Sequence, residues 1–438
     1  MKLSELKQNL GTKLQKINTN NTCDQVKIIG VTGSKGKSTV CYILQEYLKL
    51  KGKKTTLYSS IKIDAENSLY SKDEALNRAL ENEVGLYKMI NNLTSDQEYL
   101  ILEVNEKAIE EGLTKDLPFK VRCLTNLNPR HNLEQYSVEE YVNLKKLFFK
   151  DFSEECTCVY GLVDYDKPLF QELLEINDMP KITFTSNYIS QVKNVDKDSI
   201  TCLLTDIEEK ENGYAFTIKL RNQEFVINTA TSFKYNILNY LCVISILDAL
   251  NEFDVELFNR CINSIKIPGR VETIKVKGRT IIVDLYLAST IQELSKLKET
   301  GKIKNIKVVL GSVGHGFINW DDTFNKGRHF QKRHETRSYV AKLLKDYADY
   351  VYLTENDQGV ESVKEIGEEI KIALGTVKSE IIPNREEAIK KAIENSKVGD
   401  VIFISGRGNR KILCNGEKTI KFVSDIEIVN ETIKKLGW

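Results

Sequence analysis

The sequence has few of the residues that build a structural zinc site. It holds four histidines among 438 residues, its nine cysteines are scattered, and no C-x-x-C pair occurs. Structural zinc sites usually draw their ligands from closely spaced cysteine and histidine pairs. We therefore predict no structural zinc site, and we interpret the cysteines as reduced residues, mostly in the core, of a cytoplasmic protein.

The chain also has almost no net charge of either sign. Lysine and arginine number 63 against 62 aspartates and glutamates, which gives no electrostatic reason to expect nucleic acid or an anionic membrane as a partner. The longest apolar run, near residues 240–250, is too short to span a bilayer. Residues 1–17 are amphipathic and lack the continuous apolar core of a secretory signal. These absences favour a globular protein without a membrane partner.

Apolar runs alternate with amphipathic helices in the first third of the sequence. Strands are expected at residues 26–31, 98–104, 121–127 and 156–163, with helices at residues 38–51 and 138–150. This βαβ rhythm predicts a mostly parallel sheet with helices on both faces. Short alternating runs between residues 187 and 228 predict a small antiparallel meander at the edge of that sheet.

A linker, Ile267-Pro268-Gly269-Arg270, follows two more predicted helices, and both Pro and Gly end helices. After the linker, strands are expected at residues 281–286, 305–311, 349–354 and 400–405, again with helices between them. We predict the α/β fold class with three parts: a helical segment over residues 1–25, a parallel-sheet domain over residues 26–267, and a Rossmann-like α/β domain over residues 268–438.

A glycine-rich loop joins the first predicted strand to the first long helix. Residues 30–39 read G-V-T-G-S-K-G-K-S-T. Glycines let backbone N–H groups approach a phosphate, and the helix dipole favours the anion. We expect Lys37 to reach the β- and γ-phosphates of ATP and the Ser38 hydroxyl to ligate Mg²⁺. The phosphate-binding residues expected are Gly33, Ser34, Lys35, Gly36, Lys37, Ser38 and Thr39.

The strict P-loop pattern needs a glycine where Val31 stands, so a glycine-rich turn with a solvated lysine is the alternative interpretation. The form G-x-T-G-x-x-G-K-S-T is similar to the ATP loop of the Mur ligase superfamily. That group includes the peptidoglycan amino-acid ligases, folylpolyglutamate synthase and poly-γ-glutamate synthases. Further segments resemble the family in the same order over nearly the whole chain.

Three segments carry the resemblance around the metal site. Leu102-Glu103-Val104-Asn105 resembles "E-V-S-S", which implies that Glu103 binds Mg²⁺. T-N-L-N-P-R-H at residues 125–131 resembles "T-N-[LI]-x-x-D-H", which implies that His131 helps to hold a second Mg²⁺. Y-V-N-L-K-K-L-F at residues 141–148 resembles "Y-x-x-x-K-x-x-L". Lys145 would then be the family lysine, which is carbamylated in many members and can hold Mg²⁺ beside Glu103.

The spacing from His131 to Lys145 matches the UDP-N-acetylmuramoyl-tripeptide synthetase branch. A loop histidine and a solvated helix lysine are the alternative interpretations of these two residues. Farther on, Y-N-I-L-N at residues 235–239 resembles "F-N-V-x-N", which places Asn236 and Asn239 at the nucleotide. Asn239 would face adenine, because an amide offers both a donor and an acceptor to a base edge.

The second domain contributes weaker matches. P-G-R-V-E at residues 268–272 is similar to "P-G-R-x-E", and Asp284 follows a strand as the aspartate of "D-Y-A-H-x-P" does. The resemblance implies that Arg270 and Asp284 reach ATP. R-E-E-A-I at residues 385–389 resembles "R-x-x-A-I", and D-V-I-F-I-S-G-R-G-N at residues 400–409 resembles "G-D-x-x-x-x-x-G-K-G-H".

The sequence also departs from the family. The phosphate loop begins by residue 30, so we expect no N-terminal UDP-sugar-binding domain. Either the acceptor carries no UDP, or it is held differently, for example with a partner chain. The histidine after Asp284 is gone, and G-S-V-G-H-G at residues 311–316 replaces a basic loop. T-E-N-D-Q at residues 354–358 replaces the "D-N-P-R" that grips diaminopimelate.

The resemblance predicts an ATP- and Mg²⁺-dependent ligase that activates a carboxylate as an acyl phosphate and couples it to an amine, usually that of an amino acid. The predicted catalytic residues are Lys37, Glu103, His131 and Lys145, and the predicted Mg²⁺ ligands are Ser38, Glu103, His131 and carbamylated Lys145. The substrates would be a small-molecule or peptidyl carboxylate and an amine. A non-catalytic or partner-dependent Mur-like protein, and another P-loop kinase or NTPase, remain as alternatives.

Overall fold

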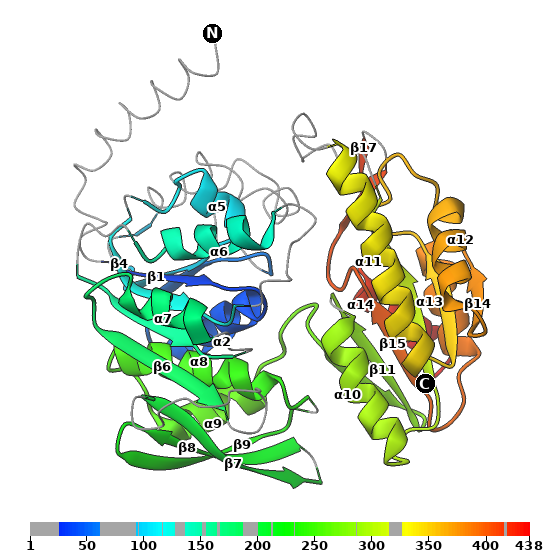
Figure 1. Cartoon of the computed structure of the whole chain (residues 1–438). Helices are drawn as coiled ribbons and strands as arrows, with labels where there is room; N and C mark the ends of the chain where they lie inside the picture. Colours follow the sequence, from blue (N-terminus) through cyan, green and yellow to red (C-terminus); the bar gives the residue numbers. More distant parts are fainter. Residues whose placement is uncertain are drawn as a thin grey trace. The chain divides into compact units, whose positions relative to one another are not determined.

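The computed structural model describes residues 26–61, 93–94, 96–115, 117–127, 136–150, 155–163, 167–186, 200–211, 213–231, 233–285, 287–314, 326–415 and 418–438. The predicted helical segment at residues 1–25 and His131 lie outside these residues. The chain divides into two compact units, one that ends at Ile265 and one that runs from Lys266 to Trp438 (Figure 1).

The first unit is built on a nine-stranded sheet in the order β2-β3-β1-β4-β5-β6-β7-β8-β9. Neighbouring strands are parallel as far as β7, and β7, β8 and β9 form an antiparallel meander at one edge, as the sequence predicted. The strands are β1 (Lys27–Thr32), β2 (Thr55–Tyr58), β3 (Tyr99–Glu103), β4 (Phe119–Leu124), β5 (Thr157–Gly161), β6 (Lys181–Ser186), β7 (Cys202–Lys210), β8 (Gly213–Leu220) and β9 (Gln223–Thr229).

Strand β1 lies between β3 and β4, and all but its first residue are buried. Its apolar run is typical of a parallel strand covered on both faces. The register pairs Val31 with Glu103 of β3 and Thr32 with Leu124 of β4. The loops that leave these three strands therefore begin at one edge of the sheet, where ligands of parallel α/β sheets bind.

Helices cover both faces of this sheet, as predicted (Figure 1). Helix α2 packs with α8 and α9, whereas α5 packs with α6. Side chains of α5 and α6, including Ala108 and Tyr141, join the apolar core against β3 and β4. The helices are α2 (Lys37–Leu50), α5 (Glu106–Glu110), α6 (Val138–Leu147), α7 (Lys167–Glu175), α8 (Asn236–Ala249) and α9 (Val255–Ser264).

The second unit is built on a six-stranded sheet in the order β10-β11-β15-β12-β13-β14. Strand β10 is antiparallel to β11, and the remaining neighbours are parallel. The strands are β10 (Glu272–Val276), β11 (Arg279–Asp284), β12 (Ile306–Gly311), β13 (Tyr350–Thr354), β14 (Lys378–Ile381) and β15 (Val401–Ser405), with a separate hairpin of β16 (Ile412–Asn415) and β17 (Lys418–Lys421).

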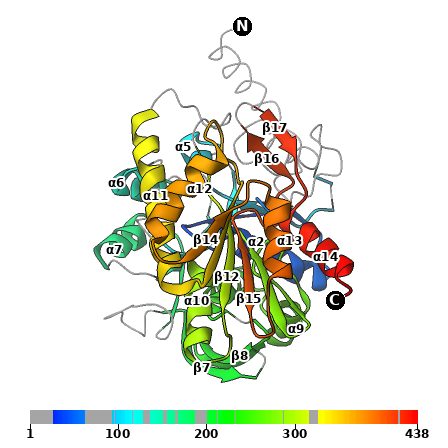
Figure 2. The same cartoon turned by 90° about the vertical axis from the view of Figure 1, so that its right-hand side faces the viewer.

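Helices flank this second sheet on both sides, with α10, α11 and α12 on one side and α13 and α14 on the other (Figure 2). They are α10 (Ala288–Glu299), α11 (Lys326–Tyr347), α12 (Val363–Leu374), α13 (Arg385–Glu394) and α14 (Asp425–Lys435). The predicted α/β class is thus confirmed for both units. Over the described ranges, no helix has the length and apolarity needed to cross a membrane.

Candidate active site

The glycine-rich loop connects β1 to α2 in a conformation that requires glycine. Gly33 has a φ of 140° and Gly36 a φ of 83°, values that side chains disfavour. A Cβ atom at Gly33 would overlap the Thr125 hydroxyl, and one at Gly36 would overlap the Asn239 amide. The predicted phosphate-binding residues 33–39 therefore form one close-packed turn from the strand into the helix.

The segment after β4 fixes this loop. The hydroxyl of Thr125 donates to the Lys35 carbonyl at 2.6 Å, and the Asn126 side-chain amide donates to the same oxygen at 2.8 Å. The Lys35 amide in turn donates to Asn126 Oδ1 at 3.1 Å, and the Ser34 amide donates to the Asn126 carbonyl at 3.1 Å. Thr125 and Asn126, the first two residues of T-N-L-N-P-R-H, thus position the backbone of the loop.

Helix α2 presents a positive end to the loop. Gly36 is its N-cap residue, and within the described residues no side chain caps the helix. Lys37 opens the helix, and its ammonium donates to the Gly33 carbonyl at 2.7 Å. First-turn amides and a lysine beside a glycine loop form the arrangement that binds phosphate oxygens.

Ser38 and Glu103, which lie 65 residues apart, meet beside the loop. The Ser38 hydroxyl donates to Glu103 Oε1 at 2.8 Å. The other carboxylate oxygen accepts from the Ser59 hydroxyl at 2.6 Å and from the Ser60 amide at 2.9 Å. Glu103 is only 5% exposed. The two serines were not predicted from the sequence, where their one signal is their place directly after β2, the neighbour of β3.

The donor set around Glu103 suits a hard divalent cation. It consists of a carboxylate and hydroxyl oxygens, the ligand type that Mg²⁺ prefers. No group of three or more His, Cys, Asp or Glu side chains that could hold a metal occurs among the residues the structure describes. Ser38 and a serine after β2 would contribute hydroxyl oxygens beside Glu103.

Lys145 lies behind the loop as a buried cation. It is fully buried on α6, and its Nζ lies 2.6 Å from Glu106 Oε1 and donates to the Thr32 hydroxyl at 2.8 Å. Burial lowers the pKa of Lys145 to about 8, an effect that the Glu106 charge opposes. Burial alone would raise the pKa of Glu106, but the charges of Lys145 and Lys37 outweigh it and bring the pKa to about 2.

The asparagines predicted at the nucleotide lie at the start of α8. The Asn239 amide donates to Asn236 Oδ1 at 3.1 Å, and Asn236 donates to the Thr231 hydroxyl at 3.2 Å. The Asn239 oxygen stands against Gly36, so the structure brings this predicted adenine contact to the phosphate loop. The contacts orient both amides.

The two residues of the second unit that were predicted to reach ATP, Asp284 and Arg270, make contacts within that unit. Asp284 ends β11, is buried, and accepts from the Thr290 hydroxyl at 2.6 Å. Arg270 follows Gly269 in the turn before β10, and its guanidinium donates to the Gly269 carbonyl at 3.3 Å.

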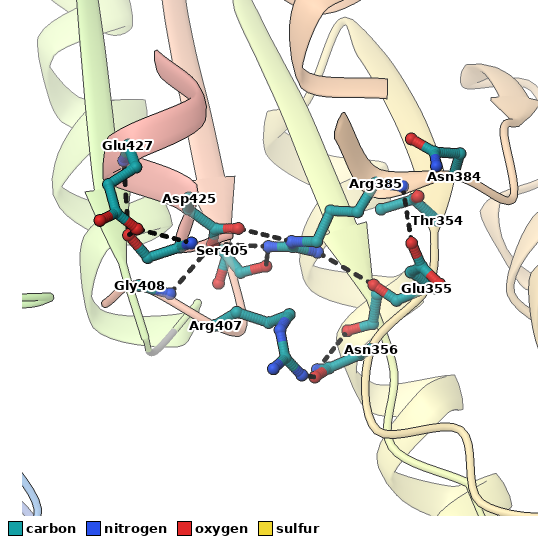
Figure 3. Close-up of polar contacts among 12 residues, drawn as sticks. Thr354, Glu355, Asn356, Asn384, Arg385, Ser405, Arg407, Gly408, Asp425 and Glu427 are labelled. Carbon is teal, nitrogen blue, oxygen red and sulfur yellow. Dashed lines mark hydrogen bonds and ion pairs between the residues drawn. The ribbon is translucent and has the colours of Figure 1, made fainter. Parts of the chain in front are cut away.

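A buried polar cluster lies at the carboxyl ends of β13 and β15 (Figure 3). Arg385 of α13 donates to both carboxylate oxygens of Asp425, at 2.7 and 2.8 Å, and to the Ser405 carbonyl at 2.9 Å. The Asp425 carboxylate also accepts from the Gly408 amide at 2.9 Å. Arg385, the arginine of R-E-E-A-I, therefore joins α13 to α14 and to the end of β15.

Arg407 forms the second half of this cluster. Its buried guanidinium donates to Asp357 Oδ1 at 2.9 Å and to Asn356 Oδ1 at 3.2 Å. Burial lowers the pKa of Arg407, an effect that Asp357 opposes. The segment T-E-N-D-Q, which differs from the family motif, thus binds the arginine of G-R-G-N.

Known proteins resemble this chain over most of its length. The chain matches the Mur ligase middle domain over residues 31–247 and the Mur ligase, glutamate ligase domain over residues 269–408. It is 24% identical over 421 residues to the UDP-N-acetylmuramoyl-L-alanyl-D-glutamate–2,6-diaminopimelate ligase of Geobacillus kaustophilus, covering 94% of this chain and 80% of that protein. The ligase of the same name from Fusobacterium nucleatum is 27% identical, with 93% and 78% covered.

Solved structures show the same fold. One of a UDP-N-acetylmuramoyl-L-alanyl-D-glutamate–2,6-diaminopimelate ligase matches with a TM-score of 0.60 and 18% identity, over 97% of this chain and 81% of that one. A pseudomurein peptide ligase type C from Methanothermus fervidus matches with a TM-score of 0.62 and 16% identity, also over 97% and 81%. The chain belongs to the Mur ligase family. It is accordingly an ATP-dependent ligase that joins a carboxylate to an amine, which confirms the predicted class of enzyme.

Proposed function

We propose that the chain converts a substrate carboxylate to an acyl phosphate at residues 33–39 and transfers the acyl group to the amine of an amino acid. The observation that carries this proposal is the meeting of Lys37, Ser38 and Glu103 at the carboxyl ends of β1 and β3. Phosphate binding and a metal-holding carboxylate are the two requirements for activating an acid with ATP.

The chain's own residues would act mainly by holding charge in place. The α2 amides and Lys37 would bind the phosphates, so that a carboxylate oxygen can attack the γ-phosphorus and release ADP. The amine nitrogen then attacks the acyl carbon, and phosphate leaves. Mg²⁺, when bound, would neutralise phosphate charge, and Ser38 and Glu103 would hold it. Lys145 on α6 would complete the site, together with His131, which lies outside the described residues.

The amine substrate is proposed to be an amino acid other than diaminopimelate. The support is the segment at residues 354–358, where Asn356 and Asp357 bind the buried Arg407. Relatives named as diaminopimelate ligases share 22–27% identity with this chain. The acid is proposed to be a peptide-like or small carboxylate, on the resemblance to the muramyl peptide ligases.

The test is phosphate release from Mg-ATP with a panel of amino acids and carboxylic acids. Release that needs one acid and one amine together, and that Lys37→Ala abolishes, is the expected result. Lys49→Ala is the matched control, because Lys49 lies on the same helix but pairs with Glu46 on the surface. Release that proceeds without an acid or an amine would instead indicate an ATPase, and ATP binding without release from any pair would contradict the proposal.

A further inference from the structure

Helix α6 contacts the start of the phosphate loop through two side chains that lie one turn apart. Tyr141 and Lys145 are both fully buried. The Tyr141 hydroxyl is hydrogen-bonded to the Ser34 hydroxyl at 2.7 Å, and the Lys145 ammonium donates to the Thr32 hydroxyl at 2.8 Å. Thr32 ends β1 and Ser34 follows Gly33, so α6 holds the chain on both sides of that glycine.

The Tyr141 ring is itself fixed in place. Its side chain belongs to the apolar core against β3 and β4. The Lys145 ammonium lies 5.4 Å from the centroid of the ring, a distance at which a cation is attracted to an aromatic face. The capping box at Ser137 fixes the first turn of α6, which leads directly to Tyr141. A hydroxyl on such a ring is a rigid point to which a loop can be attached.

The polar groups of Ser34 are bonded to the protein on both sides of the residue. The Ser34 amide donates to the Asn126 carbonyl at 3.1 Å, and the hydroxyl is bonded to Tyr141. The next amide, that of Lys35, donates to Asn126 Oδ1. Ser34 is only 3% exposed. The start of the loop therefore makes its contacts within the protein, and the first turn of α2 would present the amides for a phosphate.

We propose that Tyr141 is a positioning residue of the phosphate loop, and that Ser34 serves this contact rather than binding a phosphate. The pair of hydroxyls anchors the loop to α6, as Thr125 and Asn126 anchor it to the end of β4. The α2 amides and Lys37 are thereby held in place before a nucleotide arrives. The inference deepens the proposed function and rests on it, because it concerns the same nucleotide site.

The first test compares nucleotide affinity in three variants by calorimetric titration with ADP. Tyr141→Phe removes one hydroxyl of the pair and Ser34→Ala removes the other, so both variants lose the same hydrogen bond. Each should bind ADP about threefold to tenfold more weakly than the wild type. The double variant should bind no more weakly than either single variant, because the bond can be lost only once.

Tyr47→Phe is the matched control for Tyr141→Phe. Tyr47 is fully buried on α2, where its hydroxyl donates to the Glu252 carbonyl at 2.8 Å and accepts from the Asp254 amide at 2.9 Å. These contacts lie at the opposite end of α2 from the loop. Tyr47→Phe should therefore lower the unfolding temperature and leave the affinity for ADP unchanged.

The second test needs no nucleotide. Hydrogen exchange of a peptide that contains residues 33–39 is followed by mass spectrometry in the free protein. Loss of the anchor should make local opening of the loop easier, so this peptide should exchange faster in Tyr141→Phe and in Ser34→Ala than in the wild type. A serine that served only to touch a phosphate would leave this exchange unchanged. If Tyr141→Phe fails to fold, Ser34→Ala alone decides the matter.

A loss of ADP affinity in Ser34→Ala that clearly exceeds the loss in Tyr141→Phe, or losses that add in the double variant, would overturn the inference. Unchanged affinity in Tyr141→Phe, or unchanged exchange in Ser34→Ala, would overturn it as well. A wild-type protein that binds no ADP contradicts both this inference and the proposed function. The expected losses in a protein that ligates no acid contradict the proposed function alone.

Discussion

Buried arginines in the second unit are paired with carboxylates. Arg385 and Asp425 are both fully buried and bind each other through two parallel hydrogen bonds. Removing one partner of such a pair leaves an uncompensated charge inside the protein, which is more damaging than the loss of a surface ion pair.

Arg385→Met is therefore expected to destabilise the second unit by about 3–5 kcal/mol. Lys391→Ala is the control, since Lys391 lies on the same helix and its pair with Glu380 is exposed, where a loss of at most about 1 kcal/mol is expected. Urea unfolding followed by circular dichroism measures both. Equal losses of unfolding free energy in the two variants would show that the buried pair contributes no more to stability than the surface pair.

Gly36 offers a second test at the level of one residue. Gly36→Ala combines a positive φ with overlap of the new methyl group and Asn239, so nucleotide affinity should fall about tenfold or more, equivalent to about 1.4 kcal/mol. Gly52→Ala has a similar φ of 81° and meets nothing within 4 Å. It should lower stability by about 1–2 kcal/mol and leave affinity unchanged. Calorimetric titration with ADP distinguishes the two, and unchanged affinity in Gly36→Ala would contradict the proposed loop.

At the scale of elements, caps fix where the site helices begin. The Ser137 hydroxyl accepts from the Glu140 amide, and the Glu140 carboxylate accepts from the Ser137 amide, which starts α6. The same capping box starts α12 in the second unit, at Ser362. Of these two helices, α6 carries a side chain of the site, Lys145.

Ser137→Ala and Ser362→Ala are each expected to lower stability by about 1 kcal/mol. Ser137→Ala should also weaken nucleotide binding, by up to about fivefold, because a frayed first turn loosens the helix that positions Lys145. Thermal unfolding and ADP titration measure the two effects. A loss of affinity in Ser362→Ala as well would point to a general rather than a local cause.

The elements also show what sequence patterns can and cannot predict. Strands buried on both faces, such as β1 and β15, were predicted because their apolar runs are continuous. Strand β10 alternates half-buried and exposed residues, and β14 is short with only partial burial, so neither stands out from a loop by composition. Both lie at an edge of the second sheet, where one neighbour is missing and the apolar signal weakens.

At the scale of the whole molecule, the site residues that could be predicted are those that belong to a contiguous sequence motif. The phosphate loop is a contiguous pattern, and the structure brings Ser38 to Glu103 as expected. Ser59 and Glu106 were not predicted, because their importance comes from contacts across tens of residues that only the folded sheet creates. His131 lies outside the described residues, so its role stays a prediction.

The stability of the second unit should depend on pH through Asp400. Asp400 precedes β15 and accepts from Asn305 at 2.7 Å and from the Lys397 amide at 2.9 Å, with Lys307 at 3.1 Å. These contacts outweigh burial, which would raise its pKa, and hold the pKa below the ordinary 3.8. Because the folded-state pKa is depressed, the stabilisation is present above pH 3.8 and is lost as the pH falls through the folded-state value.

Asp400→Asn should therefore be less stable than the wild type near neutral pH, and the difference should shrink as the pH drops below about 3.8. Chemical unfolding at a series of pH values provides the measurement. Glu368→Gln is the control, because Glu368 is exposed and lies 3.9 Å from Lys371. A constant difference between Asp400→Asn and the wild type at every pH would contradict this assignment.

The segment after β4, through Thr125 and Asn126, holds the phosphate loop in its conformation. Four hydrogen bonds from and to Thr125 and Asn126 hold Ser34 and Lys35 in place. Fixing one backbone residue opposes binding by about 1–2 kcal/mol of conformational entropy. A loop already fixed by the protein spares the ligand that loss, so Asn126, which need not touch a phosphate, contributes to affinity by preorganisation.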